Sequence, residues 1–183
     1  MAIVPVVPTK AVGDLVLAAD WNDYVKGTRD FLVANKPLVH LVQTATQSGW
    51  TSATMTAVTF TAEELDRDGQ HSTTVNTSRV VIGGTLGWWR VHGIYAAPGN
   101  TNTVLTRARI ALNGSGLAAG QCNSQWSSFS GTAAIQTGVV YVEATAAADY
   151  VELQGFQQAA AGTIGTGIAV DIASTLTLEY LGL

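Results

Sequence analysis

The sequence predicts an all-β protein: a two-sheet antiparallel jelly roll of about eight strands, preceded by an extended arm and one short helix. Apolar and polar residues alternate from about Trp50 to the end, and Gly, Asn and Pro turn signals separate the alternating runs. Half-buried strands need this period of two, and several such runs in succession are typical of sandwiches and barrels. The runs are residues 79–86, 88–97, 104–112, 139–144, 150–157 and 168–181.

The amino-terminal segment differs in character. Pro5 and Pro8 fix φ and favour extended neighbours, so residues 1–9 are predicted to form an arm. Its apolar side chains either fold back on the domain or dock on a neighbouring protein; they are Ile3, Val4, Val6 and Val7. We therefore divide the chain into an arm and helix (1–36), a linker or first strand (37–48) and a jelly-roll head (49–183).

One helix is predicted, over residues 18–34. Apolar side chains recur there at spacings of three and four and form one face: Trp21, Tyr24, Val25, Thr28, Phe31 and Leu32. Gly27 inside the helix costs about 1 kcal/mol relative to alanine. The helix therefore needs a surface to pack on, either its own head, a symmetry mate or a scaffold.

Composition excludes several classes of function. The net charge is −4 and the nine basic residues form no cluster in sequence, which argues against nucleic acid as a partner. No apolar run approaches the roughly twenty residues that span a bilayer, and no secretory signal opens the chain, so we expect assembly in a cytoplasm. Charged residues are only 12 % of the chain, which indicates surface that is covered by other subunits.

Catalytic and cofactor signatures are weak. Asp66, Asp68 and His71 are the one candidate metal cluster, but position twelve of an EF-hand loop starting at Asp66 is Thr77 instead of glutamate. A solvated turn and an ion shared between subunits are the two alternatives. A small β-sandwich polysaccharide depolymerase would need paired carboxylates, for which Glu143 and Glu152 are the strand candidates. We expect no enzymatic activity, no cofactor and no resident metal.

The aromatic residues are the most informative candidates. Trp88 and Trp89 must point to opposite faces of a strand, so one of them lies outside the core, at a subunit interface, on a glycan-binding rim or under a loop. Tyr150 and Phe156 fall on the face opposite Val151 and Leu153 and are predicted at a trimer interface. Arg107 and Arg109 share a strand face and are predicted to join that interface by pairing with Glu152 across subunits.

Several segments resemble one family. The run Val12-Gly13-Asp14 to Ala18-Ala19-Asp20-Trp21-Asn22-Asp23-Tyr24-Val25 resembles the opening of small bacteriophage virion proteins. Asp66–Ser72, Gly93–Tyr95, Arg107–Gly114 and Asp149–Leu153 are similar to the β-domain that follows in that family. Leu17 stands where the family has a helix-capping threonine, and residues 85–89 fit loosely. The resemblance implies a jelly roll similar to the heads of complement and tumour-necrosis-factor proteins, which assemble as trimers.

The sequence and the resemblance together predict a homotrimeric virion structural protein, either a capsid decoration protein or a head fibre. The anchor residues on the major capsid protein, or on another virion protein, would be Ile3, Val4, Val6, Val7, Trp21, Tyr24, Val25 and Phe31. The trimer interface would contain Trp88, Tyr150, Phe156, Arg107 and Arg109. The alternative is a tail-associated receptor-binding protein whose loop with Trp126 and Phe129 contacts host surface glycans.

Overall fold

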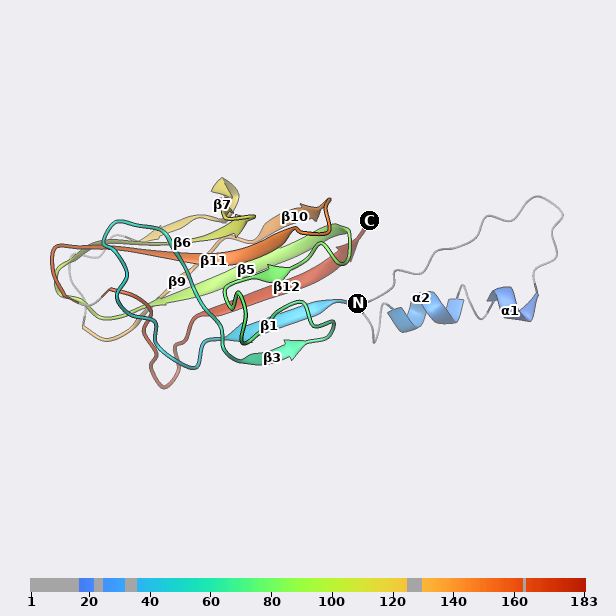
Figure 1. The fold of residues 1–183 in the computed structure, drawn as a ribbon, viewed down its shortest axis with the longest axis horizontal. Coiled ribbons are helices and arrows are strands. Elements are labelled where there is room, and N and C mark those ends of the chain that lie inside the picture. Colours follow the sequence, from blue (N-terminus) through green and yellow to red (C-terminus); the bar gives the residue numbers. More distant parts are fainter. Residues whose placement is uncertain (1–16, 22–24, 32–35, 125–129, 163) are drawn as a thin grey trace.

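The computed structural model describes residues 17–21, 25–31, 36–124, 130–162 and 164–183. Within these ranges the chain is a two-layer β-sandwich with two short helices beyond one end (Figure 1). The helices are α1 (Ala18–Trp21) and α2 (Gly27–Asp30), and a 3₁₀ turn occupies Ala118–Gly120. The strands are β1 (Leu38–Val42), β2 (Thr56–Ala57), β3 (Glu63–Asp66), β4 (Val80–Val81), β5 (Gly87–Ala97), β6 (Thr103–Leu112), β7 (Ser115–Gly116), β8 (Cys122–Ser124), β9 (Ala133–Gln136), β10 (Val140–Ala144), β11 (Tyr150–Ala159) and β12 (Thr175–Gly182).

Each layer is an antiparallel sheet built around two long strands. The first sheet has the order β10-β5-β12-β1-β3, and β9 pairs with the second half of β5. The second has the order β2-β11-β6-β7, with β4 beside the start of β11 and β8 beside the middle of β6. The predicted all-β jelly-roll class is confirmed.

The core lies between the two sheets and follows from the alternation in the sequence. Along β5 and β12, alternate residues are buried, and the largest of them interdigitate with β6 and β11. Trp89 packs edge-to-face on Tyr180 with ring centroids 5.3 Å apart. The fully buried large side chains include Trp89, Tyr95, Tyr180, Phe60, Ile110 and Leu153.

At the level of single elements, the structure decides between two predicted alternatives in one segment and differs from the prediction in three others. Of the two alternatives for residues 37–48, the structure shows a strand, because β1 lies between β12 and β3. Residues 63–66 form strand β3, which is not among the predicted runs; this edge strand buries little, so it carries no apolar alternation. The run 79–86 contributes only the two residues of β4. In 168–181 the strand begins at Thr175, because residues 169 and 172 close a turn.

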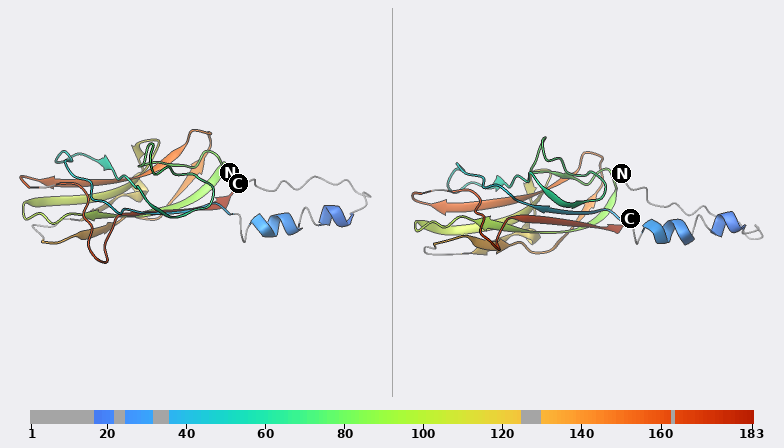
Figure 2. Two further views of the ribbon diagram at one scale, coloured as in Figure 1. Left: turned by 60° about the horizontal axis from the view of Figure 1, so that its bottom comes forward. Right: turned by 90° about the horizontal axis from the view of Figure 1, so that it is seen from below.

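The helical segment lies beyond the end of the sandwich where β12 ends, and the views in Figure 2 agree on this placement. Of the helix predicted over 18–34, the structure describes α1, α2 and residues 25, 26 and 31. Phe31 is buried and packs edge-to-face on Tyr180, with ring centroids 6.1 Å apart, so its ring belongs to the core of the head. Among the described residues, neither helix has the length or apolarity to cross a bilayer.

Hydrogen bonds join the turn of the β6–β7 hairpin to Asp149, the residue just before β11. Asn113 and Gly114 both have positive φ, as a two-residue Asn-Gly turn requires. The Asn113 amide donates to Asp149 Oδ1 at 2.9 Å, and the backbone N–H groups of Thr145 and Ala146 donate to Oδ2 at 2.8 Å each. The Asn113 amide first, and these backbone donors second, hold the pKa of Asp149 below its usual value. Asp149 is therefore a structural carboxylate that fixes a loop.

Gly155 in β11 is a position where a side chain does not fit, and Gly155→Ala is expected to destabilise the fold. An added Cβ would lie 2.6 Å from the Tyr95 ring and 2.9 Å from the Trp50 ring, which stack on each other with centroids 5.6 Å apart. Overpacking of this kind costs about 1–3 kcal/mol. Urea unfolding measures the change; Gly27→Ala, in α2 with open space around it, is the control and should not destabilise. An unchanged midpoint for Gly155→Ala would contradict the packing described.

Candidate functional site

The outer face of the first sheet carries large apolar side chains that the fold leaves exposed. On β5 and β10, Trp89 and Val142 point into the core, so their neighbours Trp88 and Tyr141 point outward, with 43 % and 62 % of their surfaces exposed. We call this surface the apolar face and define it by Val42, Trp88, Ile94, Tyr141 and Leu181, one or two from each of β1, β5, β10 and β12.

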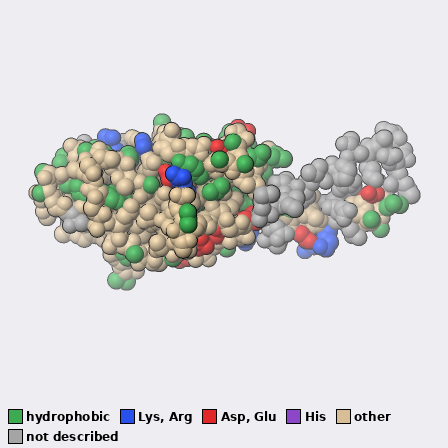
Figure 3. Space-filling view, viewed as in Figure 1, with side chains coloured by type: hydrophobic (Ala, Val, Ile, Leu, Met, Phe, Trp, Pro, Cys, Tyr) green, Lys and Arg blue, Asp and Glu red, His purple; other side chains and the backbone are tan. Residues whose placement is uncertain are grey.

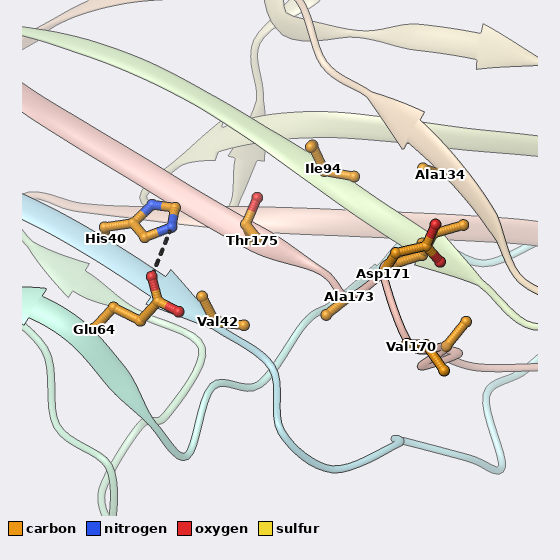
Figure 4. Close-up of a pocket in the computed structure, with 11 residues that line it drawn as sticks. His40, Val42, Glu64, Ile94, Ala134, Val170, Asp171, Ala173 and Thr175 are labelled. Carbon is orange, nitrogen blue, oxygen red and sulfur yellow. Dashed lines mark ion pairs between the residues drawn. The ribbon is translucent and has the colours of Figure 1, made fainter.

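A hollow of about 400 Å³ lies on the apolar face, where the loop after residue 167 leans over β1 and β5. Ile94 and Thr175 contribute to its floor, and His40 and Glu64 stand on one side (Figure 4). Val170 and Asp171 lie on the loop at the other side, and Val170 is fully exposed. A hollow with apolar walls and an exposed apolar lip is suited to receive a side chain of another protein.

Three charged groups of the apolar face are paired with one another, whereas Glu143, the register partner of Trp88, is exposed. Lys36 Nζ donates to Glu179 Oε1 at 2.7 Å, and Arg90 lies 3.6 Å from Oε2 of the same carboxylate. The Lys36 hydrogen bond, followed by the attraction of both cations, lowers the pKa of Glu179. Since paired charges are less costly to bury than isolated ones, this arrangement suits a surface that another subunit covers.

A polar row crosses the centre of the same face. His92, Thr177 and His40 are register neighbours on β5, β12 and β1, and a hydrogen bond of 2.8 Å joins His40 Nδ1 to Thr177 Oγ1. His40 Nε2 lies 3.5 Å from Glu64. Partial burial first, and the nearby Arg90 and His40 second, lower the pKa of His92. The lowered pKa favours the uncharged form of His92.

The outer face of the second sheet is different in chemistry. We call it the arginine face and define it by Arg79, Arg107 and Arg109 with the β11 residues beneath them. The Arg79 guanidinium lies 4.3 Å from the Tyr150 ring centroid, and Arg107 lies 5.2 Å from that of Phe156. Arg109 Nε donates to Gln154 Oε1 at 2.7 Å. Figure 3 shows basic side chains at the edge of the molecule above β6 and acidic ones over β3 at the opposite edge.

The structure separates the predicted trimer residues into two groups. Trp88 lies on the apolar face, whereas Tyr150, Phe156, Arg107 and Arg109 lie together on the arginine face. A closed ring uses two different patches of each subunit, and patches on opposite faces of a sandwich favour an open stack over a ring, because the rotation between copies must close the ring. Glu152 is buried and bound within its own chain, by Ser78 Oγ at 2.9 Å and Arg79 Nε at 3.4 Å. The trimer contacts stay a prediction, and the two groups need separate tests.

The predicted anchor and receptor residues lie largely outside the described part of the chain. Residues 3, 4, 6, 7 and 24 of the anchor set, and the loop residues Trp126 and Phe129, are not described. Trp21 lies in α1, and Val25 between the helices is 44 % exposed. Phe31 is buried against the head, as described above, so in this structure it is not available to a partner.

The candidate chemical sites have structural uses. The Asp66 carboxylate accepts the backbone N–H groups of Gln70 at 3.0 Å and His71 at 2.9 Å, and His71 Nδ1 lies 2.8 Å from Glu63. In the described ranges, His, Cys, Asp and Glu form no group of three placed to hold a metal. Glu143 lies on β10 and Glu152 on β11, so the two carboxylates considered for glycoside hydrolysis lie in different sheets.

Sequence reasoning missed Tyr141 as an exposed residue of the apolar face, and it missed the hollow beside His40. The alternation Val140-Tyr141-Val142 already indicated that Tyr141 points outward, so the signal for it was present in the sequence. No signal exists for the hollow, because its lining comes from β1, β3, β5, β9, the loop before β12 and the first residue of β12.

The comparisons with known proteins show the fold. No family model matches the sequence, and no curated protein matches it. Among solved structures, murine APRIL at pH 5.0 superposes with a TM-score of 0.54 at 10 % identity, covering 79 % of this chain and 98 % of that one. Murine APRIL structures at pH 8.5 and pH 8.0 give TM-scores of 0.52 and 0.53 at 12 % and 11 % identity, each covering 78 % of this chain and 98 % of theirs. The head of this chain thus has a jelly-roll fold similar to that of murine APRIL.

Proposed function

We propose that this chain is a bacteriophage virion structural protein, a homotrimeric capsid decoration protein or head fibre that acts by adhesion and performs no chemistry. The observation that carries the assembly is the apolar face, where the exposed aromatic side chains of Trp88 and Tyr141 lie beside the paired charges of Arg90 and Glu179. Interface cores are enriched in Tyr and Trp. The heads therefore associate through the first sheet, and the contact uses Trp88 and Tyr141.

The virion location is supported by the resemblance of residues 12–25 and of the β-domain motifs to small phage virion proteins. The shape of the molecule is consistent with it, since α1 and α2 lie beyond one end of the sandwich. A partner that held this helical segment, such as the major capsid protein, would leave the opposite end of the head pointing outward at the virion surface.

Removal of residues 1–30 tests the anchor role, and we expect a folded head that no longer binds capsids. The cut is placed before Phe31 because that ring packs in the head core. Circular dichroism and thermal unfolding should match those of the full chain, while co-sedimentation with empty capsids should fall to background. Capsid binding equal to that of the full chain would contradict the anchor.

Gold labelling in electron microscopy then distinguishes the two virion locations. Label on the head of the particle supports decoration of the capsid. Label at the tail, together with binding of the purified protein to host cells, would replace this proposal by the receptor-binding alternative.

A further inference from the structure

The arginine face concentrates positive charge on a protein whose net charge is −4. Three of the nine basic residues lie on it, and the one carboxylate among the β11 residues beneath them, Glu152, is taken up by Arg79 and Ser78. We propose that this face binds an extended acidic segment of a partner protein, whose carboxylates at alternate positions pair with Arg107 and Arg109.

Arg107 is presented ready for such a ligand. Its guanidinium lies over the ring of Phe156, and that ring is buried. Its Nε is buried, so only the terminal nitrogens can donate to a ligand, and Arg107 forms no ion pair with a described carboxylate. A guanidinium that is stacked on a ring has already lost much of its conformational freedom, so it loses little more when it binds a ligand. Its planar fork of N–H donors suits a carboxylate.

Arg109 is held in a similar way by different groups. Gln154 Oε1 accepts from its Nε, and the guanidinium lies against the backbone of Gly116. A Cβ on Gly116 would lie 2.5 Å from the guanidinium carbon, so the absence of a side chain there makes room for the arginine. Arg109, like Arg107, has no described carboxylate within ion-pair distance. Its two terminal nitrogens remain as donors for a ligand.

The spacing of the two arginines indicates the form of the ligand. They are two residues apart on β6 and face the same side, so their Cα atoms are separated by about 6.6–6.8 Å, twice the rise of a strand residue. Carboxylates two residues apart on an extended chain have the same spacing. An extended segment running along β6 can therefore place one carboxylate on each guanidinium, and charge-assisted pairs of this geometry are the stronger kind of hydrogen bond.

The contrast with the apolar face supports separate roles for the two surfaces. Arg90 on β5 is paired with Glu179, whereas Arg107 and Arg109 keep their charge available. The proposal thus assigns the four predicted trimer residues of the arginine face to a different partner, and it does not depend on the virion role proposed above.

The test uses the full chain and two synthetic ten-residue peptides of equal composition, measured by fluorescence anisotropy. In one peptide glutamate alternates with threonine; in the other the five glutamates form one block. We expect the alternating peptide to bind about tenfold more tightly than the block peptide. Arg107→Gln and Arg109→Gln should each weaken it about tenfold, the loss of one charged pair. Arg90→Gln, on the apolar face, is the matched control and should leave the affinity unchanged.

Three results would overturn the proposal. The first is equal affinity for the two peptides, or an equal loss with Arg90→Gln, because either would mean general attraction of negative charge. The second is tighter binding of a sulfated polysaccharide such as heparin, which would identify a glycan site. The third is dissociation of the assembly by the double substitution of Arg107 and Arg109 in light scattering, which would make this face a subunit contact. Thermal unfolding of each variant verifies that the head remains folded.

Discussion

Replacing Trp88 and Tyr141 together by glutamate is expected to convert the assembled protein into monomers that remain folded. Light scattering should give a mass near three times 19.1 kDa for the native chain and near 19.1 kDa for the variant at micromolar concentration. Both side chains are exposed on the isolated chain, so the substitution disturbs little within one head. In an assembly, each subunit would bury unpaired carboxylates, at a cost of several kcal/mol per ion. Each 1.4 kcal/mol weakens the association tenfold, so a cost of several kcal/mol per ion is enough to dissociate a contact of ordinary affinity.

Val104→Glu is the matched control for this experiment. Val104 is also exposed and apolar, but it lies on β6 in the second sheet. We expect its mass to equal that of the native chain. A trimer that survives the double substitution on the apolar face, or a monomer produced by Val104→Glu, would show that the first sheet is not the contact. A native chain that is monomeric at micromolar concentration would contradict the trimer altogether.

Trp89→Ala is expected to destabilise the head by about 3–5 kcal/mol, the range for loss of a large buried aromatic ring. Trp89 is fully buried, packs on Tyr180 and donates its Nε1 hydrogen to the Thr85 carbonyl at 3.2 Å. Tyr180 in turn contacts Phe31, so the cavity would also loosen the attachment of the segment that follows α2. Domains of ordinary stability have about 5–15 kcal/mol in total, so this single change removes a large part of the stability.

Trp88→Ala provides the comparison, because it removes the same side chain one residue earlier. It should cost about 1 kcal/mol or less, since its ring lies on the exposed surface. Both variants are measured by urea unfolding in a chain that also carries Tyr141→Glu, at a concentration where light scattering gives monomers. Folding is then separated from assembly. Equal losses for the two tryptophans would contradict the assignment of Trp89 to the core.

The long strands were predictable, and the short ones were not. β5, β6 and β10 lie largely between core and solvent, so each displays the period of two that a half-buried strand requires, whereas β11 is buried on both faces and alternates only in the polarity of its residues. β3 is a polar edge strand, and β4 has two residues, too few to show any period. The turn at Asn113 and Gly114 was predictable, because few residues other than Asn and Gly accept positive φ. The residues that a hairpin turn requires are neighbours in the sequence, whereas the pairing of an edge strand depends on a segment far away in the sequence.

The candidate sites divide along the same line. The sequence by itself determined the fold class, the outward position of one of the two adjacent tryptophans, and the shared face of Arg107 and Arg109, because alternation within a strand is a property of neighbouring residues. It could not determine which tryptophan is buried, which depends on the orientation of β5 relative to the second sheet. Only the tertiary structure placed Trp88 and the arginines on opposite faces, paired Glu152 within its own chain and buried Phe31 in the head. These outcomes depend on contacts between segments far apart in the chain.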